Sequence, residues 1–181
     1  MLIIATSISG SGRKEYLTEL TEYAKKFGKK IKIYHVGQML FEHAENVGIH
    51  LTPENILNAN PSVIHAVRGA VFENILANID KDRKENDVVI ISIHSIFFWK
   101  DRFMRAYDRF YLNKLNPDMF VTLFARATDI LNTLNSRKQW KSQKLTLHEI
   151  LLWQNVEVEM TASWAEIDRI PFYVVSVLQP I

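Results

Sequence analysis

The sequence predicts an α/β fold in which a five-stranded parallel β-sheet carries helices on both faces, forming a three-layer sandwich. Short apolar runs recur along the chain, segments with helical spacing lie between them, and a loop rich in glycine and serine follows the first run. Nearly continuous apolar runs are typical of strands buried on both faces of a parallel sheet, and strand–helix alternation predicts right-handed βαβ units. The predicted strands are residues 2–8, 31–36, 88–93, 119–124 and 172–177.

Length and composition restrict the class of protein. The 181 residues suit a single domain, 1–181, and the absence of cysteine excludes disulfides, thiolate catalysis and cysteine-based zinc sites. The histidines lack the spacing of a metal site, so we predict no bound zinc. A net charge of +2 is too small to indicate nucleic-acid binding by itself. The first apolar stretch is too short for a signal peptide or a membrane span, which predicts a cytoplasmic protein without membrane contact.

The most informative segment is the loop after the first predicted strand, which reads Ser-Ile-Ser-Gly-Ser-Gly-Arg-Lys over residues 7–14. A strand, a glycine-rich turn and a helix N-terminus together surround anions with backbone N–H groups. Against the phosphate-loop pattern G-x-x-x-x-G-K-[ST], only Gly12 is kept, because Ser7, Arg13 and Lys14 stand at the other defining positions. Two interpretations stay open: an anion site, or a helix start whose basic residues only face water.

Three connections complete the predicted layout. The helix after the loop carries an apolar stripe over residues 16–27, with Gly28 where a C-terminal cap belongs. The connection 37–87 is long, and its later helix begins behind Pro61, as a first-turn proline would place it. Residues 127–146 form a further segment before the last strand. This plan resembles a nucleoside-monophosphate kinase, in which 37–87 would cover the acceptor and 127–146 would form a lid.

Short blocks of sequence carry a more specific resemblance to the archaeal adenylate kinase-like group of P-loop kinases. They are residues 9–12, 36–44, 91–94, 115–118 and 127–131, in the order and spacing of that family. The resemblance implies a bound nucleotide, ATP or another purine nucleotide, with the need for Mg²⁺ left open. It implies nucleotide-binding roles for Ser9, Gly10, Ser11, Gly12, Arg13, Lys14, Gln38, Arg137 and Lys138, and catalytic roles for Arg13 and His94.

The sequence departs from that family at the positions that carry out the family's chemistry. Its loop lysine falls on Arg13, its loop hydroxyl on Lys14, and the acid that ends its third strand on Ser92. Arginine carries charge in a longer, forked group, and a protonated lysine cannot ligate Mg²⁺. We therefore expect a nucleotide-binding protein with little or no phosphoryl transfer. One alternative is an active ATP-dependent kinase in which Arg13 replaces the lysine. A further alternative is an interaction protein that binds no nucleotide and uses the aromatic and arginine-rich surface of residues 97–111.

Residues 97–111 combine seven aromatic and four basic residues with only two acids. Helical spacing would place Phe103, Tyr107, Phe110 and Tyr111 on one face. Three interpretations stay open. The segment is an ordinary core helix, a surface for a protein partner or a second copy, or a surface for RNA, which has the least support. The residues of the predicted surface are Phe97, Trp99, Arg102, Arg105 and Arg109.

Overall fold

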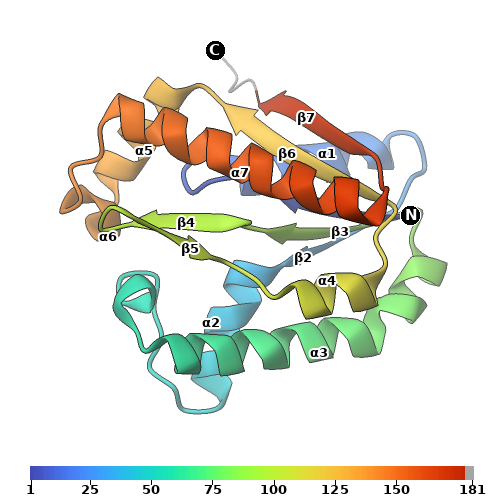
Figure 1. The fold of residues 1–181 in the computed structure, drawn as a ribbon. Helices are drawn as coiled ribbons and strands as arrows, with labels where there is room; N and C mark the ends of the chain where they lie inside the picture. Colours follow the sequence, from blue (N-terminus) through green and yellow to red (C-terminus); the bar gives the residue numbers. More distant parts are fainter. Residues whose placement is uncertain (178–181) are drawn as a thin grey trace.

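The computed structural model describes residues 1–177, and within them a five-stranded parallel sheet has the strand order β2-β3-β1-β6-β7. All four strand pairs run parallel, so the five strands end at one common edge (Figure 1). The strands are β1 (Leu2–Thr6), β2 (Ile31–His35), β3 (Val88–Ile93), β6 (Met119–Ala125) and β7 (Phe172–Val177). The predicted fold class and all five predicted strands are confirmed.

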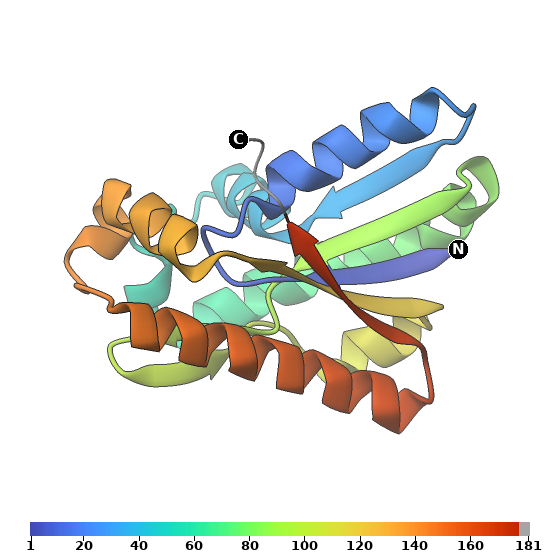
Figure 2. The same cartoon turned by 90° about the horizontal axis from the view of Figure 1, so that it is seen from above.

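Alternate residues of the central strands face two different apolar layers. Leu2 and Ile4 of β1 pack with helix α3 (Pro61–Glu85), whereas Ala5 packs with Leu17 of helix α1 (Arg13–Lys25). Figure 2 shows α1 on one face of the sheet, and α3, α4 (Arg109–Leu115) and α7 (Leu147–Asp168) on the other. The prediction of strands buried on both faces was wrong for the edge strand β7, because Tyr173 and Val174 are about half exposed.

The remaining helices gather toward the edge where the strands end (Figure 1). They are α2 (Val36–Asn46), the short 3₁₀ turn η1 (Ile56–Asn58), α5 (Ala127–Ser136) and α6 (Lys138–Lys141). The predicted acceptor-side segment thus contains α2, η1 and α3, and the predicted lid segment contains α5 and α6. Pro61 begins α3 as expected, with the Asn60 side chain accepting the N–H of Ser62 as an N-cap.

The prediction of a helix over residues 97–111 was wrong, because its first half is an antiparallel hairpin. Strands β4 (Ile96–Trp99) and β5 (Arg102–Arg105) are joined by Lys100 and Asp101, both with positive φ. A two-residue turn of this kind matches the twist of a hairpin but usually contains glycine. Trp99 and Tyr107 are buried, and α4 begins only at Arg109, so the five residues of the predicted partner surface do not share one exposed face.

Candidate functional site

A pocket of about 330 Å³ opens at the edge where β1, β2 and β3 end. Parallel sheets place ligands outside the carboxyl ends of their strands, next to the point where the strand order reverses. The pocket brings together every predicted binding residue except Lys138, which lies exposed on α6. Its lining consists of residues 7–15 with His35, Gly37, Gln38, Ser92, His94 and Arg137.

The loop between β1 and α1 has the backbone geometry of an anion site. Gly10 and Gly12 adopt φ of 82° and 77°, and Gly12 is the N-cap of α1 without a side-chain cap. Among the described residues, the backbone N–H groups of 9–12 find no acceptor, and those of the first helical turn have none within the helix. Free N–H groups at a helix N-terminus bind phosphate and similar anions.

Arg13 is drawn into this loop rather than extended into water. Its Nη1 donates to the carbonyl oxygens of Ser7, at 3.2 Å, and of Ile93 at the end of β3, and its Nη2 approaches Nε2 of His94 at 3.4 Å. Burial lowers the pKa of the guanidinium to about 10, while the charge of Glu157 opposes that shift. Arg13 therefore keeps its positive charge at neutral pH and spans the ends of β1 and β3.

His94 is the partner that completes this arrangement. Its Nδ1 lies 2.5 Å from the carbonyl oxygen of Ser7, which has no proton to donate, so Nδ1–H is the donor and Nε2 is left as an acceptor for Arg13. Burial, followed by the charge of Arg13, holds the pKa of His94 well below its usual value. Neutral His94 thus contacts both Ser7 and Arg13, and its catalytic role stays a prediction.

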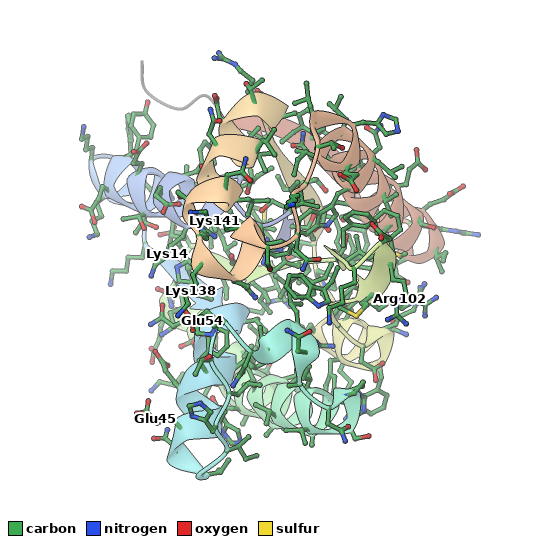
Figure 3. All side chains as sticks on the ribbon, turned by 90° about the vertical axis from the view of Figure 1, so that its left-hand side faces the viewer. Lys14, Glu45, Glu54, Arg102, Lys138 and Lys141 are labelled. Carbon is green, nitrogen blue, oxygen red and sulfur yellow. The ribbon has the colours of Figure 1, made fainter. Side chains whose placement is uncertain are left out.

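Two more arginines lie close enough to affect His94. The charges of Arg137, which follows α5, and of Arg68, on α3, both lower the pKa of His94. Burial also lowers the pKa of Arg68, which Asp108 opposes. Of these residues, Arg13 and Arg137 line the pocket with His94, whereas Arg68, which was not among the predicted binding residues, does not. Figure 3 views this edge and shows Lys14 in the same part of the face as Lys138 and Lys141 of α6.

Comparison with known proteins assigns this chain to a family. The family model described as an AAA domain matches residues 6–150, which is most of the chain. The chain belongs to the AAA domain family. No curated protein matches its sequence. Its loop and sheet are those of a P-loop kinase-like protein, whereas membership of the archaeal adenylate kinase-like group stays a prediction.

Two solved structures are similar to this AAA domain chain. The crystal structure of TT1252 from Thermus thermophilus matches with a TM-score of 0.51 and 12% identity, covering 99% of this chain and 89% of that one, and this likeness shows the fold alone. Shikimate kinase from Bacteroides thetaiotaomicron matches with a TM-score of 0.49 and 13% identity, covering 96% and 85%. Within residues 1–177, no helix is long and apolar enough to cross a membrane.

The pocket of this AAA domain chain does not fit the usual Mg²⁺ site of P-loop proteins. That site needs a Ser or Thr hydroxyl after the loop lysine and an acidic residue on a neighbouring strand. Lys14 and Ser92 occupy these positions, and Lys14 contacts Gln38 at 3.4 Å. The one carboxylate in the pocket lining of the described chain is Glu15, an exposed residue in the first turn of α1.

Sequence reasoning missed a buried carboxylate on the AAA domain's long helix α7. Glu157 is 1% exposed, and its two carboxyl oxygens accept the backbone N–H groups of Ser95 and Ile96 at 2.8 and 3.0 Å. Burial raises its pKa above the usual range. The spacing of Glu157, four residues after Trp153 and seven before Trp164, was the sequence signal for its place on the buried face of α7, and the packing against the β3–β4 junction shows its partners.

Proposed function

We propose that this AAA domain protein binds the phosphate groups of a purine nucleotide, ATP or a related compound, with little or no phosphoryl transfer. The observation that carries the proposal is the set of hydrogen bonds that the Arg13 guanidinium makes. A guanidinium has five N–H donors, of which three are engaged by Ser7, Ile93 and His94, so two are left to face an anion. Arg13 lines the same pocket as residues 9–12, whose backbone N–H groups find no acceptor among the described residues.

The arrangement favours binding over catalysis. Transfer of a phosphoryl group depends on a mobile point charge at the β- and γ-phosphates and on a metal held between them. Arg13 is fixed to two carbonyl groups, and Lys14 and Ser92 stand where the metal-holding groups belong. These features support a nucleotide complex whose formation depends on Arg13 and the loop N–H groups and is insensitive to Mg²⁺.

Active phosphoryl transfer is the second candidate. It is favoured by one observation, the presence of both Arg13 and Arg137 in the lining of the pocket, because several arginines can stabilise the charge of a transferring phosphoryl group. In this alternative Arg13 takes the role of the loop lysine, and ATP consumption requires Mg²⁺.

Calorimetric titration with ATP, ADP, AMP and GTP tests the first candidate, using the wild type, Arg13→Ala and Lys25→Ala. We expect Arg13→Ala to weaken ATP binding by about tenfold to a hundredfold, the size of one or two hydrogen bonds to a charged group. Lys25→Ala is the matched control, because Lys25 is an exposed basic residue at the other end of α1 and pairs with Glu22 at 2.6 Å. Equal ATP affinity in the wild type and Arg13→Ala would contradict the proposal.

Mg²⁺-dependent ADP release from ATP separates the two candidates. Turnover that disappears in Arg13→Ala would establish the kinase alternative and contradict the first proposal. Turnover at the same background level in the wild type and the variant is the result that the first proposal predicts.

A further inference from the structure

Residues 94–96 join the central sheet to the hairpin and are held from one side by α7. Besides the two N–H groups that Glu157 accepts, Ser95 Oγ donates to the backbone oxygen of Glu157 at 3.3 Å. The indole N–H of Trp153 donates to the carbonyl oxygen of Ile96 at 3.0 Å. Four hydrogen bonds from one turn of α7 therefore fix the two residues that follow His94.

Fixing these residues also fixes the direction in which His94 points. With the backbone of Ser95 and Ile96 held, the imidazole contacts Phe97, at 4.7 Å between ring centroids, and Ser7. The Nδ1–H bond to Ser7 leaves Nε2 directed at Arg13. A path of direct contacts thus runs from Glu157 through the backbone of Ser95 to His94 and on to Arg13.

The charges of Glu157 and Arg13 provide a second connection between these two residues. Glu157 and Arg13 are not among the ion pairs of the described residues, yet the charge of each shifts the pKa of the other. Glu157 is the acid whose charge stabilises the protonated guanidinium of Arg13. A carboxylate placed behind the loop offsets the cost of burying Arg13 without occupying the donors that face the pocket.

We propose that Glu157 is the positioning residue of the phosphate site: its carboxyl group holds the β3–β4 junction so that His94 presents Nε2 to Arg13. The inference rests on the proposed nucleotide binding for its effect on affinity, but its effect on His94 does not require a nucleotide. Glu157 does not touch the ligand, and it acts through His94 and Arg13.

The test is Glu157→Gln, which keeps the size of the side chain but replaces one acceptor oxygen by an amide that repels a backbone N–H. Its control is Gln154→Leu, one turn earlier on the same helix. Gln154 is 3% exposed, and its Oε1 accepts the backbone N–H of Ala125 at 3.2 Å, at the end of β6 rather than at the junction. The two variants therefore lose buried hydrogen bonds to backbone N–H groups at different places.

Nitrogen-15 chemical shifts of the His94 imidazole, measured without nucleotide, report the tautomer. We expect Nδ1–H in the wild type and in Gln154→Leu, and a mixture of tautomers in Glu157→Gln. ATP affinity should fall by about tenfold in Glu157→Gln, the size of one hydrogen bond to a charged group, and stay unchanged in Gln154→Leu. An unchanged tautomer in folded Glu157→Gln would overturn the inference, even if the wild type bound no ATP.

A second measurement covers the case in which Glu157→Gln fails to fold. In Arg13→Met, carbon-13 titration of the Glu157 carboxyl group should show its pKa raised further than in the wild type, because the charge of Arg13 lowers it. An unchanged pKa would remove the electrostatic connection between the two residues and overturn the inference. Failure of ATP to bind the wild type, with the tautomer and pKa as expected, would overturn the proposed function alone.

Discussion

Arg13 and His94 meet across the ends of two neighbouring strands, with Nη2 of the guanidinium 3.4 Å from Nε2 of the imidazole. Arg13 begins the helix that follows β1, and His94 comes directly after β3, which pairs with β1. The contact joins two residues 81 positions apart in the chain. The contact places His94 against the phosphate loop, where Nε2 accepts a hydrogen bond from Arg13 and donates none.

The neutral state of His94 predicts that stability depends on pH. The pKa of His94 is lowered well below 6.5 by burial and by Arg13, Arg137 and Arg68, which face it from three elements. Below pH 6.5 His94 is therefore protonated in the unfolded chain but stays neutral in the folded protein. The free energy of unfolding should fall with decreasing pH, by up to about 1.4 kcal/mol per pH unit from this group.

Urea unfolding between pH 7.5 and 5.5 measures this dependence in the wild type, His94→Gln and His35→Gln. The pKa of His35 is also lowered, so its removal should reduce the slope to a smaller degree. The raised pKa of Glu157 makes the free energy of unfolding change with pH in the opposite direction. This contribution is common to the wild type and the variants, so it cancels when their slopes are subtracted. Equal slopes in the wild type and His94→Gln would contradict a neutral His94.

The close approach of the loop to α5 predicts a cost for any side chain at position 10. A Cβ on Gly10 would lie 3.1 Å from the side chain of Leu134, at a φ of +82°. Gly10→Ala should lower stability by about 2–4 kcal/mol through the strained φ and the contact, and it should weaken ATP binding. Gly28→Ala is the control, because its φ is +67° but nothing lies within 4 Å of the added Cβ. Chemical denaturation would contradict the account if both variants lost the same stability.

The hairpin predicts a stability effect far from the loop. Trp140 of α6 is 2% exposed and packs edge-on against Trp99 of β4, at 5.3 Å between centroids, and against Trp153 of α7. Trp140→Ala should cost about 3–5 kcal/mol of unfolding free energy, as for other buried aromatic truncations. Phe110→Ala, at a residue 54% exposed, should cost less than about 1 kcal/mol. Similar losses in the two variants would contradict the assignment of Trp140 to the core.

Much of the fold could be predicted because the strands are local apolar runs. The strands at 88–93 and 172–177 match β3 and β7 residue for residue, and Pro61 marked the start of α3. The hairpin could not be predicted, because its turn residues, Lys100 and Asp101, adopt positive φ without glycine. The aromatic spacing of residues 97–111 fits a helix equally well, and only the pairing of β4 with β5 distinguishes the two.

For the site as well, residues that are close in sequence could be predicted, whereas contacts between distant segments could not. The loop residues Ser9, Gly10, Ser11 and Gly12 could be predicted, because a phosphate loop is one continuous segment. The buried position of Glu157 depends on how α7 packs against a junction more than 60 residues earlier in the chain. Its spacing from Trp153 and Trp164 places Glu157 on the buried face of the helix, but its partners Ser95 and Ile96 could be found only in three dimensions.

The mismatch with Mg²⁺ predicts that metal dependence can be introduced. Arg13→Lys, Lys14→Thr and Ser92→Asp together supply the point charge, the hydroxyl and the acid that P-loop proteins use. We expect ATP binding to become Mg²⁺-dependent in this triple variant and to stay insensitive in Arg13→Lys alone. Titration with and without Mg²⁺ measures both, and a triple variant that ignores Mg²⁺ would show that other groups prevent metal binding.

The central claim is that the loop holds nucleotide phosphates through Arg13 and backbone N–H groups and without a metal. Calorimetric titration of the wild-type protein with ATP, in the presence of Mg²⁺ and in the presence of a chelator, tests it most directly. The account predicts binding of equal affinity under both conditions. No binding under either condition, or binding that appears only with Mg²⁺, would contradict it.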